Sequence, residues 1–222
     1  MRFGTAMIAA GLTLAGATAL WSAPRELPGK ADASRVVAGT YLTDPSHTLV
    51  GWRLGHMGFN DYFGLLGEIK GTLVLDPAKP AAAKVIVGIP LGKILTASAA
   101  LNSELLRPGA PRGKAGGQAS KPRYFGPNPG EAVFTSTAVK PGADGTSAMI
   151  EGTLALNGKT RPVIIAAKFS GAGKNPYTGK PTVGFHGTAQ IIRSEFGLDS
   201  DLGLVADRVD LEITAAFELQ KP

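Results

Sequence analysis

The chain has 222 residues, a length that one all-β domain commonly reaches, and no cysteine, which excludes disulfides, lipid-modified cysteines, cysteine-ligated metals and cysteine nucleophiles. Its net charge of +6 indicates nucleic-acid binding only if the basic residues cluster beside aromatic ones. The one basic cluster, within residues 107–123, lies in a run rich in Gly, Pro and Ala. We therefore predict a solvated loop there and no nucleic-acid partner.

The first residues resemble a secretory signal. Arg2 gives a positive start, residues 6–20 are apolar or small, and Ala17-Thr18-Ala19 offers a cleavage site. The stretch is short for a bilayer span, which needs about 20 apolar residues. We predict a signal peptide over residues 1–19, with a cut near 23 as the alternative, a linker over 20–38 and a periplasmic location. An uncleaved anchor and a buried helix are the open alternatives.

The remaining chain is expected to form one β domain over residues 39–220. Short runs of apolar and β-branched residues alternate with Gly, Pro, Asn and Asp, a pattern typical of strands and turns. The predicted strands span residues 39–42, 49–56, 67–75, 84–89, 132–139, 147–156, 161–169, 183–193 and 205–219. Many short strands at even spacing predict a sandwich or a barrel.

The connections between these strands are also marked. A turn is predicted at Asn60-Asp61 and a loop over residues 171–182, while Asn157-Gly158 is a strong hairpin signal. One short helix is expected between Thr96, its N-cap, and Pro108. Residues 109–120 are low in complexity and are expected to form a mobile loop.

The last strand alternates almost perfectly with period two. Its apolar residues share one face and its polar residues share the other, which indicates a half-buried antiparallel strand. The apolar face carries Val209, Leu211, Ile213, Ala215 and Phe217. Before this strand, Arg193-Ser194-Glu195-Phe196-Gly197 forms a charged, glycine-ended corner, for which a structural role or a place at a pocket rim is expected.

No arrangement of residues points strongly to catalysis. Residues 152–160 nearly match a phosphate-binding loop, but a strand rather than a helix follows, so a hairpin is predicted. His47, His56 and His186 leave a metal-dependent enzyme open, although no two have the spacing that pairs ligands on one helix or strand. No nucleophile elbow or carboxylate pair is visible. We therefore expect a non-catalytic protein with no cofactor and no metal.

The barrel interior is the best candidate for a functional site, since an eight-stranded barrel can be filled by side chains or hold one ligand. Large apolar side chains are expected to line it, with core packing as the alternative for each. The predicted ligand-binding residues are Trp52, Leu54, Phe59, Phe63, Leu73, Ile89, Phe134, Leu154, Phe185, Ile213 and Phe217. Arg193 is expected at the rim, where it would orient a head group.

Several motifs in this order resemble the YceI-like family of exported, lipocalin-like barrels that bind polyisoprenoids. They are YLTDPSH at 41–47, HMG at 56–58, FG at 63–64, GTLALNGKTRPV at 152–163 and IRSEFG at 192–197. The resemblance covers about residues 39–218 and departs between 106 and 134, where this chain is rich in Gly, Lys and Pro.

The resemblance implies an antiparallel lipocalin-like β-barrel with one short helix that carries or sequesters a polyisoprenoid or another long-chain lipid. It adds transient membrane contact as an expectation and leaves a homodimer open. The rival interpretation is a structural or stress-related envelope protein with a packed core.

Overall fold

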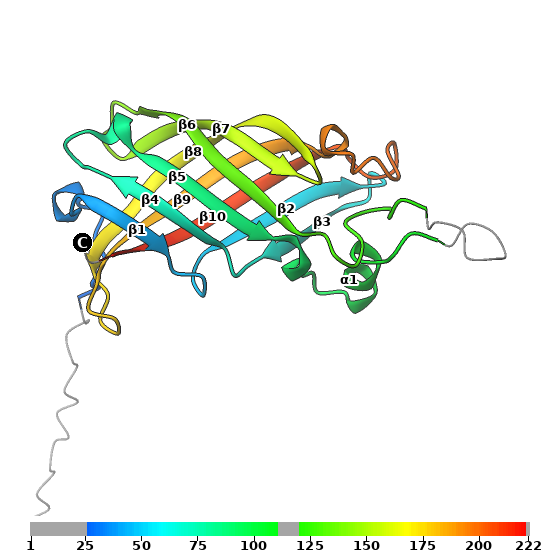
Figure 1. Cartoon of the computed structure of the whole chain (residues 1–222), viewed down its shortest axis with the longest axis horizontal. Helices are drawn as coiled ribbons and strands as arrows, with labels where there is room; N and C mark the ends of the chain where they lie inside the picture. Colours follow the sequence, from blue (N-terminus) through cyan, green and yellow to red (C-terminus); the bar gives the residue numbers. More distant parts are fainter. Residues whose placement is uncertain (1–25, 111–119, 221–222) are drawn as a thin grey trace, which may run out of the picture.

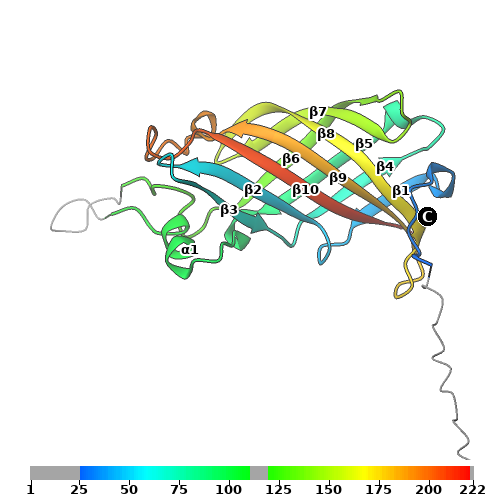
Figure 2. The ribbon, with the colours of Figure 1, turned by 180° about the vertical axis from the view of Figure 1, so that it is seen from behind.

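The computed structural model describes residues 26–110 and 120–220, and within them ten strands form one antiparallel sheet that closes into a barrel (Figures 1 and 2). The strands are β1 (Gly39–Thr43), β2 (Leu49–His56), β3 (Asn60–Leu66), β4 (Lys70–Leu75), β5 (Lys84–Pro90), β6 (Glu131–Pro141), β7 (Ser147–Leu156), β8 (Lys159–Lys174), β9 (Pro181–Ile192) and β10 (Arg208–Leu219). The single α-helix in the described part is α1 (Ala99–Leu105), and four short 3-10 turns join it: η1 (Ala33–Arg35), η2 (Pro80–Ala82), η3 (Leu91–Lys93) and η4 (Arg193–Phe196).

Strand β1 closes the ring because it pairs with β4 on one side and with β10 on the other. The ring therefore contains eight strands, β1 and β4 to β10, which confirms the predicted antiparallel barrel with one short helix. The β2–β3 hairpin continues the wall, since β2 pairs with β10 next to the stretch that β1 uses. None of the described helices is both long enough and apolar enough to cross a membrane.

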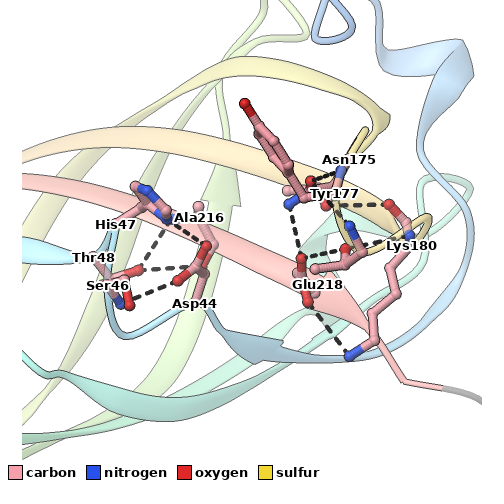
Figure 3. A network of polar contacts seen from close by, with 11 residues as sticks. Asp44, Ser46, His47, Thr48, Asn175, Tyr177, Lys180, Ala216 and Glu218 are labelled. Carbon is pink, nitrogen blue, oxygen red and sulfur yellow. Dashed lines mark hydrogen bonds and ion pairs between the residues drawn. The ribbon is translucent and has the colours of Figure 1, made fainter.

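The turn between β1 and β2 is fastened to β10 at Ala216 (Figure 3). The Asp44 amide and the Thr48 hydroxyl both donate to the Ala216 carbonyl, and the Ala216 amide donates to the Thr48 hydroxyl. Nearby on β10, Glu218 accepts hydrogen bonds from Asn175 and Thr178 in the β8–β9 turn (Figure 3). Strand β10 thus holds two turns of the chain in addition to three strands.

All nine predicted strands are present, but three local predictions were wrong. Asn60-Asp61 is not a turn: it begins β3, and the tight turn is made by Met57 and Gly58, whose φ angles of 51° and 72° lie in the left-handed region. The loop expected over 171–182 shortens to 175–180, because β8 continues through a bulge after Phe169. Ser98, not Thr96, caps α1 by accepting a hydrogen bond from the Leu101 amide.

Two predictions fall wholly or largely on residues outside the described part: the signal peptide at 1–19 and most of the loop at 109–120. Of the expected linker, residues 26–38 are described. They run along the barrel rather than away from it, since Lys30 forms a β-bridge with Ala172 on β8. The domain limits stay predictions.

Candidate functional site

The barrel encloses an apolar cavity of about 330 Å³. Its width follows from a row of small residues in register across three strands: Ala148 on β7 is opposite Ala167 on β8, and Ala167 is opposite Gly187 on β9. All three line the cavity. Larger residues at the same level would fill the interior, so this row creates the space.

The cavity reaches the end of the barrel at which the β4–β5 and β6–β7 connections lie. Loop residues that line it come from the β4–β5 connection, including Pro77 and Pro80, and from the β6–β7 connection, including Gly145 and Thr146. The same end carries η1 and the N-terminal part of the described chain, on the left in Figure 1. Two further loop residues, Thr48 in the β1–β2 turn and Ile69 in the β3–β4 connection, line the cavity from the other ends of β1 and β4. We call the first end the mouth.

The opposite end is closed by packed side chains. Leu101, Leu105 and Leu106 of the α1 region pack with Phe196 and Leu198 from the β9–β10 connection, in the same buried cluster as the barrel wall. Figure 1 shows α1 beside the β2–β3 hairpin, away from the mouth. The described structure is therefore a cup with an apolar interior.

The N-terminal segment lies across the mouth as a strap, which we define as residues 28–36. Lys30 and Ala172 exchange two backbone hydrogen bonds of 3.1 and 2.8 Å. Ala33 and Val36, further along the strap, line the cavity. The close approach depends on Gly173 of β8, where an added Cβ would lie 2.0 Å from the Pro28 carbonyl oxygen.

We expect Gly173→Ala to detach the strap, because the new methyl group would collide with the Pro28 backbone. Backbone atoms cannot swing aside as the end of a flexible side chain can. Hydrogen exchange at the Lys30 and Ala172 amides should accelerate at least tenfold, and bound ligand should leave faster. Gly29→Ala is the matched control, since a Cβ at Gly29 meets nothing within 4 Å. Equal exchange rates in the two variants would show that the strap is held in some other way.

Seven of the eleven predicted ligand-binding residues line the cavity: Leu73, Ile89, Phe134, Leu154, Phe185, Ile213 and Phe217. Trp52 and Leu54 belong to the same packed cluster as part of this wall but do not line the cavity. The inward face predicted for β10 is correct, because Leu211, Ile213, Ala215 and Phe217 all line the cavity. Contact of any of these side chains with a ligand stays a prediction.

Phe59 and Phe63 do not face the interior, contrary to the prediction. They are 86% and 72% exposed. Phe59 follows the Met57-Gly58 turn, and in β3 the inward positions are taken by Gly64 and Leu66, which turns Phe63 outward. Burial alternates along β3 with a period of two. Because Gly64 on the inner face has no side chain, the sequence did not show which face is buried.

Arg193 is not at an open rim either, which corrects its predicted role. It is 4% exposed and lies near the closed end. Its guanidinium donates to the carbonyl groups of Leu198, Ser200, Val205 and Ala206, all within the β9–β10 connection. Arg193 therefore uses four of its five N–H donors to hold this connection in shape, and it is buried away from the mouth, where a head group would lie.

A group of polar side chains, which we call the latch, joins the β5–β6 connection to the β9–β10 connection at the closed end. Asp201 accepts hydrogen bonds from Arg123 and from the Tyr124 hydroxyl, the latter at 2.8 Å. These two donors lower the pKa of the Asp201 carboxyl, while burial, followed by the bond to Asp201, raises the pKa of Tyr124 to about 12. The latch thus stays intact at neutral pH. Its stabilising effect is lost as the pH falls through the lowered pKa of Asp201 and, at the alkaline limit, as the pH rises through the raised pKa of Tyr124.

The three histidines lie apart in the fold, in the β1–β2 turn, at the end of β2 and in β9. His47 contacts Asp44 at 2.6 Å and is exposed, and the His56 ring lies against Tyr62. Within residues 26–110 and 120–220, no group of three or more His, Asp or Glu side chains is arranged to hold a metal ion.

Sequence reasoning missed the residues that make the cavity hollow. It singled out large side chains, whereas the space depends on Ala148, Ala167 and Gly187, and the mouth on Ala33 and Val36. The signal for the first three lies in strand register: small residues that face each other on neighbouring strands. A single chain segment does not display that pattern.

These features define a class of protein: a small antiparallel β-barrel that encloses an apolar cavity open at one end. The chain belongs to the YceI-like family, whose domain model matches residues 41–217. It is 33% identical to a UPF0312 protein of Pseudomonas fluorescens over 188 residues, which cover 82% of this chain and 88% of that protein. It is also 33% identical to Protein YceI of Escherichia coli over 191 residues, or 85% of this chain and 92% of the relative.

Solved structures share the fold. BcnA of Burkholderia cenocepacia superposes with a TM-score of 0.62 at 22% identity, covering 78% of this chain and 98% of BcnA. A polyisoprenoid binding domain from Saccharophagus degradans, implicated in plant cell wall breakdown, superposes with a TM-score of 0.57 at 9% identity, covering 83% of this chain and all of that domain. The predicted fold and family are both confirmed.

Proposed function

We propose that this protein binds a long-chain apolar lipid, such as a polyisoprenoid, inside the barrel, and carries or sequesters it without chemical change in the bacterial cell envelope. The observation that carries the proposal is the one-ended cavity, whose wall is built from side chains such as Val87, Phe134, Ile165 and Leu211. A lining of this kind favours aliphatic chains over polar or charged molecules.

The energetics support such a ligand. Burying one CH₂ group contributes about 0.8 kcal/mol, so about ten buried carbons provide roughly 8 kcal/mol, the equivalent of micromolar affinity before other costs. The volume of about 330 Å³ lies at the lower end of the range of about 300–1,000 Å³ that ligand pockets occupy. A long chain would therefore fill the cavity and extend through the mouth, where the strap lies.

One structural neighbour supports this proposal. The Saccharophagus degradans domain of the same fold is described as binding polyisoprenoids. Export to the envelope is part of the proposal because of the signal-like residues 1–19. Transient membrane contact and a homodimer stay predictions.

Organic extraction of the purified full-length protein, followed by mass spectrometry, tests the proposal. We expect a bound isoprenoid or fatty chain in stoichiometric amount, and saturable binding of an added polyprenol to the extracted, refolded protein. A protein that purifies without lipid and binds neither polyprenols nor fatty chains would contradict it. Cleavage of the added chain by the protein would contradict the non-catalytic part.

A further inference from the structure

The mouth presents an almost fully exposed aromatic side chain. Tyr177, in the β8–β9 turn, is 96% exposed, and Figure 3 shows its ring directed away from Glu218. The turn is held in one shape, because Asn175 and Thr178 donate hydrogen bonds to Glu218. The Asn175 side chain also accepts a hydrogen bond of 2.9 Å from the Tyr177 amide. A large ring that a fixed turn keeps in water marks a contact surface when other apolar residues are exposed around it.

Other apolar residues are exposed around the same opening. Leu27, which precedes the strap, is 76% exposed. Residues 77–82 of the β4–β5 connection are all exposed, and they consist of proline and alanine with a single lysine, Lys79. Pro77 and Pro80 also line the cavity, so this exposed run continues into the apolar wall. The rim of the mouth therefore carries apolar surface from three separate parts of the chain.

The mouth is the more positive end of the barrel. Its charged side chains come from the N-terminal segment, from the end of β10 and from three connections, within residues 26–38, 76–84, 140–147, 174–181 and 218–220. These ranges contain seven basic and five acidic side chains, while the rest of the described chain contains eleven basic and twelve acidic ones. The excess of positive charge thus lies around the opening, where it attracts anionic surfaces.

Several of these cations are available to an external anion. Lys79 and Lys174 are exposed and form no ion pair with any residue that the structure describes. Three other lysines of the mouth each pair with a glutamate: Lys30, Lys140 and Lys180. Three of the five carboxylates accept hydrogen bonds from amides of their own turns: Asp32, Asp76 and Asp144. Exposed lysines beside exposed apolar residues are the combination that binds an anionic lipid surface.

A second group of exposed apolar residues lies at the opposite end of the barrel and serves as a comparison. It includes Phe59 and Phe63 of the β2–β3 hairpin and Leu204 of the β9–β10 connection. A bilayer against that end would leave the opening in water, so a lipid chain would have to cross the solvent to enter the cavity. The mouth combines exposed apolar residues, excess positive charge and the opening itself.

We infer that the mouth docks on an anionic lipid bilayer, an assignment that rests on the proposed function. Tyr177 and the β4–β5 connection enter the headgroup region, and Lys79 and Lys174 contact anionic headgroups. In this orientation a lipid chain passes from the bilayer into the cavity without exposing its apolar surface to water. The strap, which lies across the mouth, then stands between the bilayer and the cavity.

Sedimentation of the exported protein with phosphatidylcholine vesicles, with and without phosphatidylglycerol, tests the docking surface. The double variant Lys79→Glu, Lys174→Glu should bind the anionic vesicles about thirtyfold more weakly, or about 2 kcal/mol at 1.4 kcal/mol per tenfold, because each lysine near an anionic surface contributes about 1 kcal/mol. Tyr177→Ser should weaken binding about fivefold. High salt should remove the effect of the lysines and keep that of the tyrosine.

Matched controls lie away from the mouth. Lys70 and Lys93 are exposed lysines near the other ends of β4 and β5, and Phe59 is an aromatic residue about as exposed as Tyr177. The double variant Lys70→Glu, Lys93→Glu and the single variant Phe59→Ser should bind vesicles as the wild type does. Equal binding by the wild type and the mouth variants, or a greater loss in the control variants, would overturn the docking surface.

A solubilised polyprenol separates this inference from the proposed function. Lys79, Lys174 and Tyr177 do not line the cavity, so the mouth variants should bind the solubilised chain with wild-type affinity. They should take it up from anionic vesicles at least tenfold more slowly. Unchanged uptake rates would overturn docking at the mouth and leave the proposed function standing. Failure of the wild type to bind the solubilised chain would overturn the proposed function itself.

Discussion

Replacing Ala167 by phenylalanine is expected to reduce lipid affinity at least a hundredfold while the barrel stays folded. Ala167 lines the cavity between Ala148 and Gly187, so the new ring enters the space that this row of small residues leaves open. It would displace about four chain carbons, and at about 0.8 kcal/mol each this amounts to roughly 3 kcal/mol, or more than two decades in affinity. Since the ring enters empty space, the strain typical of overpacked cores should be small.

Ala166→Phe is the matched control. Ala166 is the preceding residue of β8 and is exposed on the outer face, so the same substitution there leaves the cavity unchanged. Titration of both variants with a fluorescent polyene chain measures the affinities, and circular dichroism checks the fold. Equal binding by both variants would mean that the lipid does not use the interior.

Arg193→Met is expected to lower the free energy of unfolding by about 3 kcal/mol or more. The substitution leaves one buried and three part-buried carbonyl groups of residues 198–206 without this donor, and each buried group costs about 1–3 kcal/mol when relaxation or water does not compensate. For a chain of this size, 1 kcal/mol shifts the midpoint by about 2–4 °C, so a fall of roughly 10 °C is expected. Arg193→Lys should also destabilise the protein, because one ammonium cannot reach the same set of carbonyls.

Urea unfolding compares Arg193→Met with Arg208→Met, an exposed arginine at the start of β10 whose loss should cost less than about 0.5 kcal/mol. Lipid affinity at a temperature where both variants are folded separates the structural role of Arg193 from the rim role. Unchanged stability together with weaker lipid binding would restore the rim role that the structure contradicts.

Much of the fold could be predicted because most strands and turns have signals within short segments of the sequence. The alternation of residues 209–217 and the Asn157-Gly158 pair each depend on neighbours in the chain, and both predictions are confirmed. Strand β3 was missed because apolar Phe63 and Leu65 lie on its outer face, while Gly64 on its inner face gives no apolar signal.

The site was harder to predict than the fold, since a cavity is a property of several strands at once. Ala148, Ala167 and Gly187 are unremarkable in their own segments and become a row only when register sets them side by side. Arg193 was misjudged for the opposite reason. An arginine beside a glycine corner usually faces solvent, and only the return of residues 198–206 buries it.

The closure of the ring by β1 and β10 has a consequence for how the protein acquires its cavity. Tyr41, Leu42 and Thr43 of β1 pair with Leu219, Glu218 and Phe217 of β10, so the two strands come from opposite ends of the described chain. Joining them carries the entropy cost of the longest loop in the molecule, and such non-local pairing makes folding slow. Without β10 the sheet stays open, so the cavity forms only when this last strand pairs with β1.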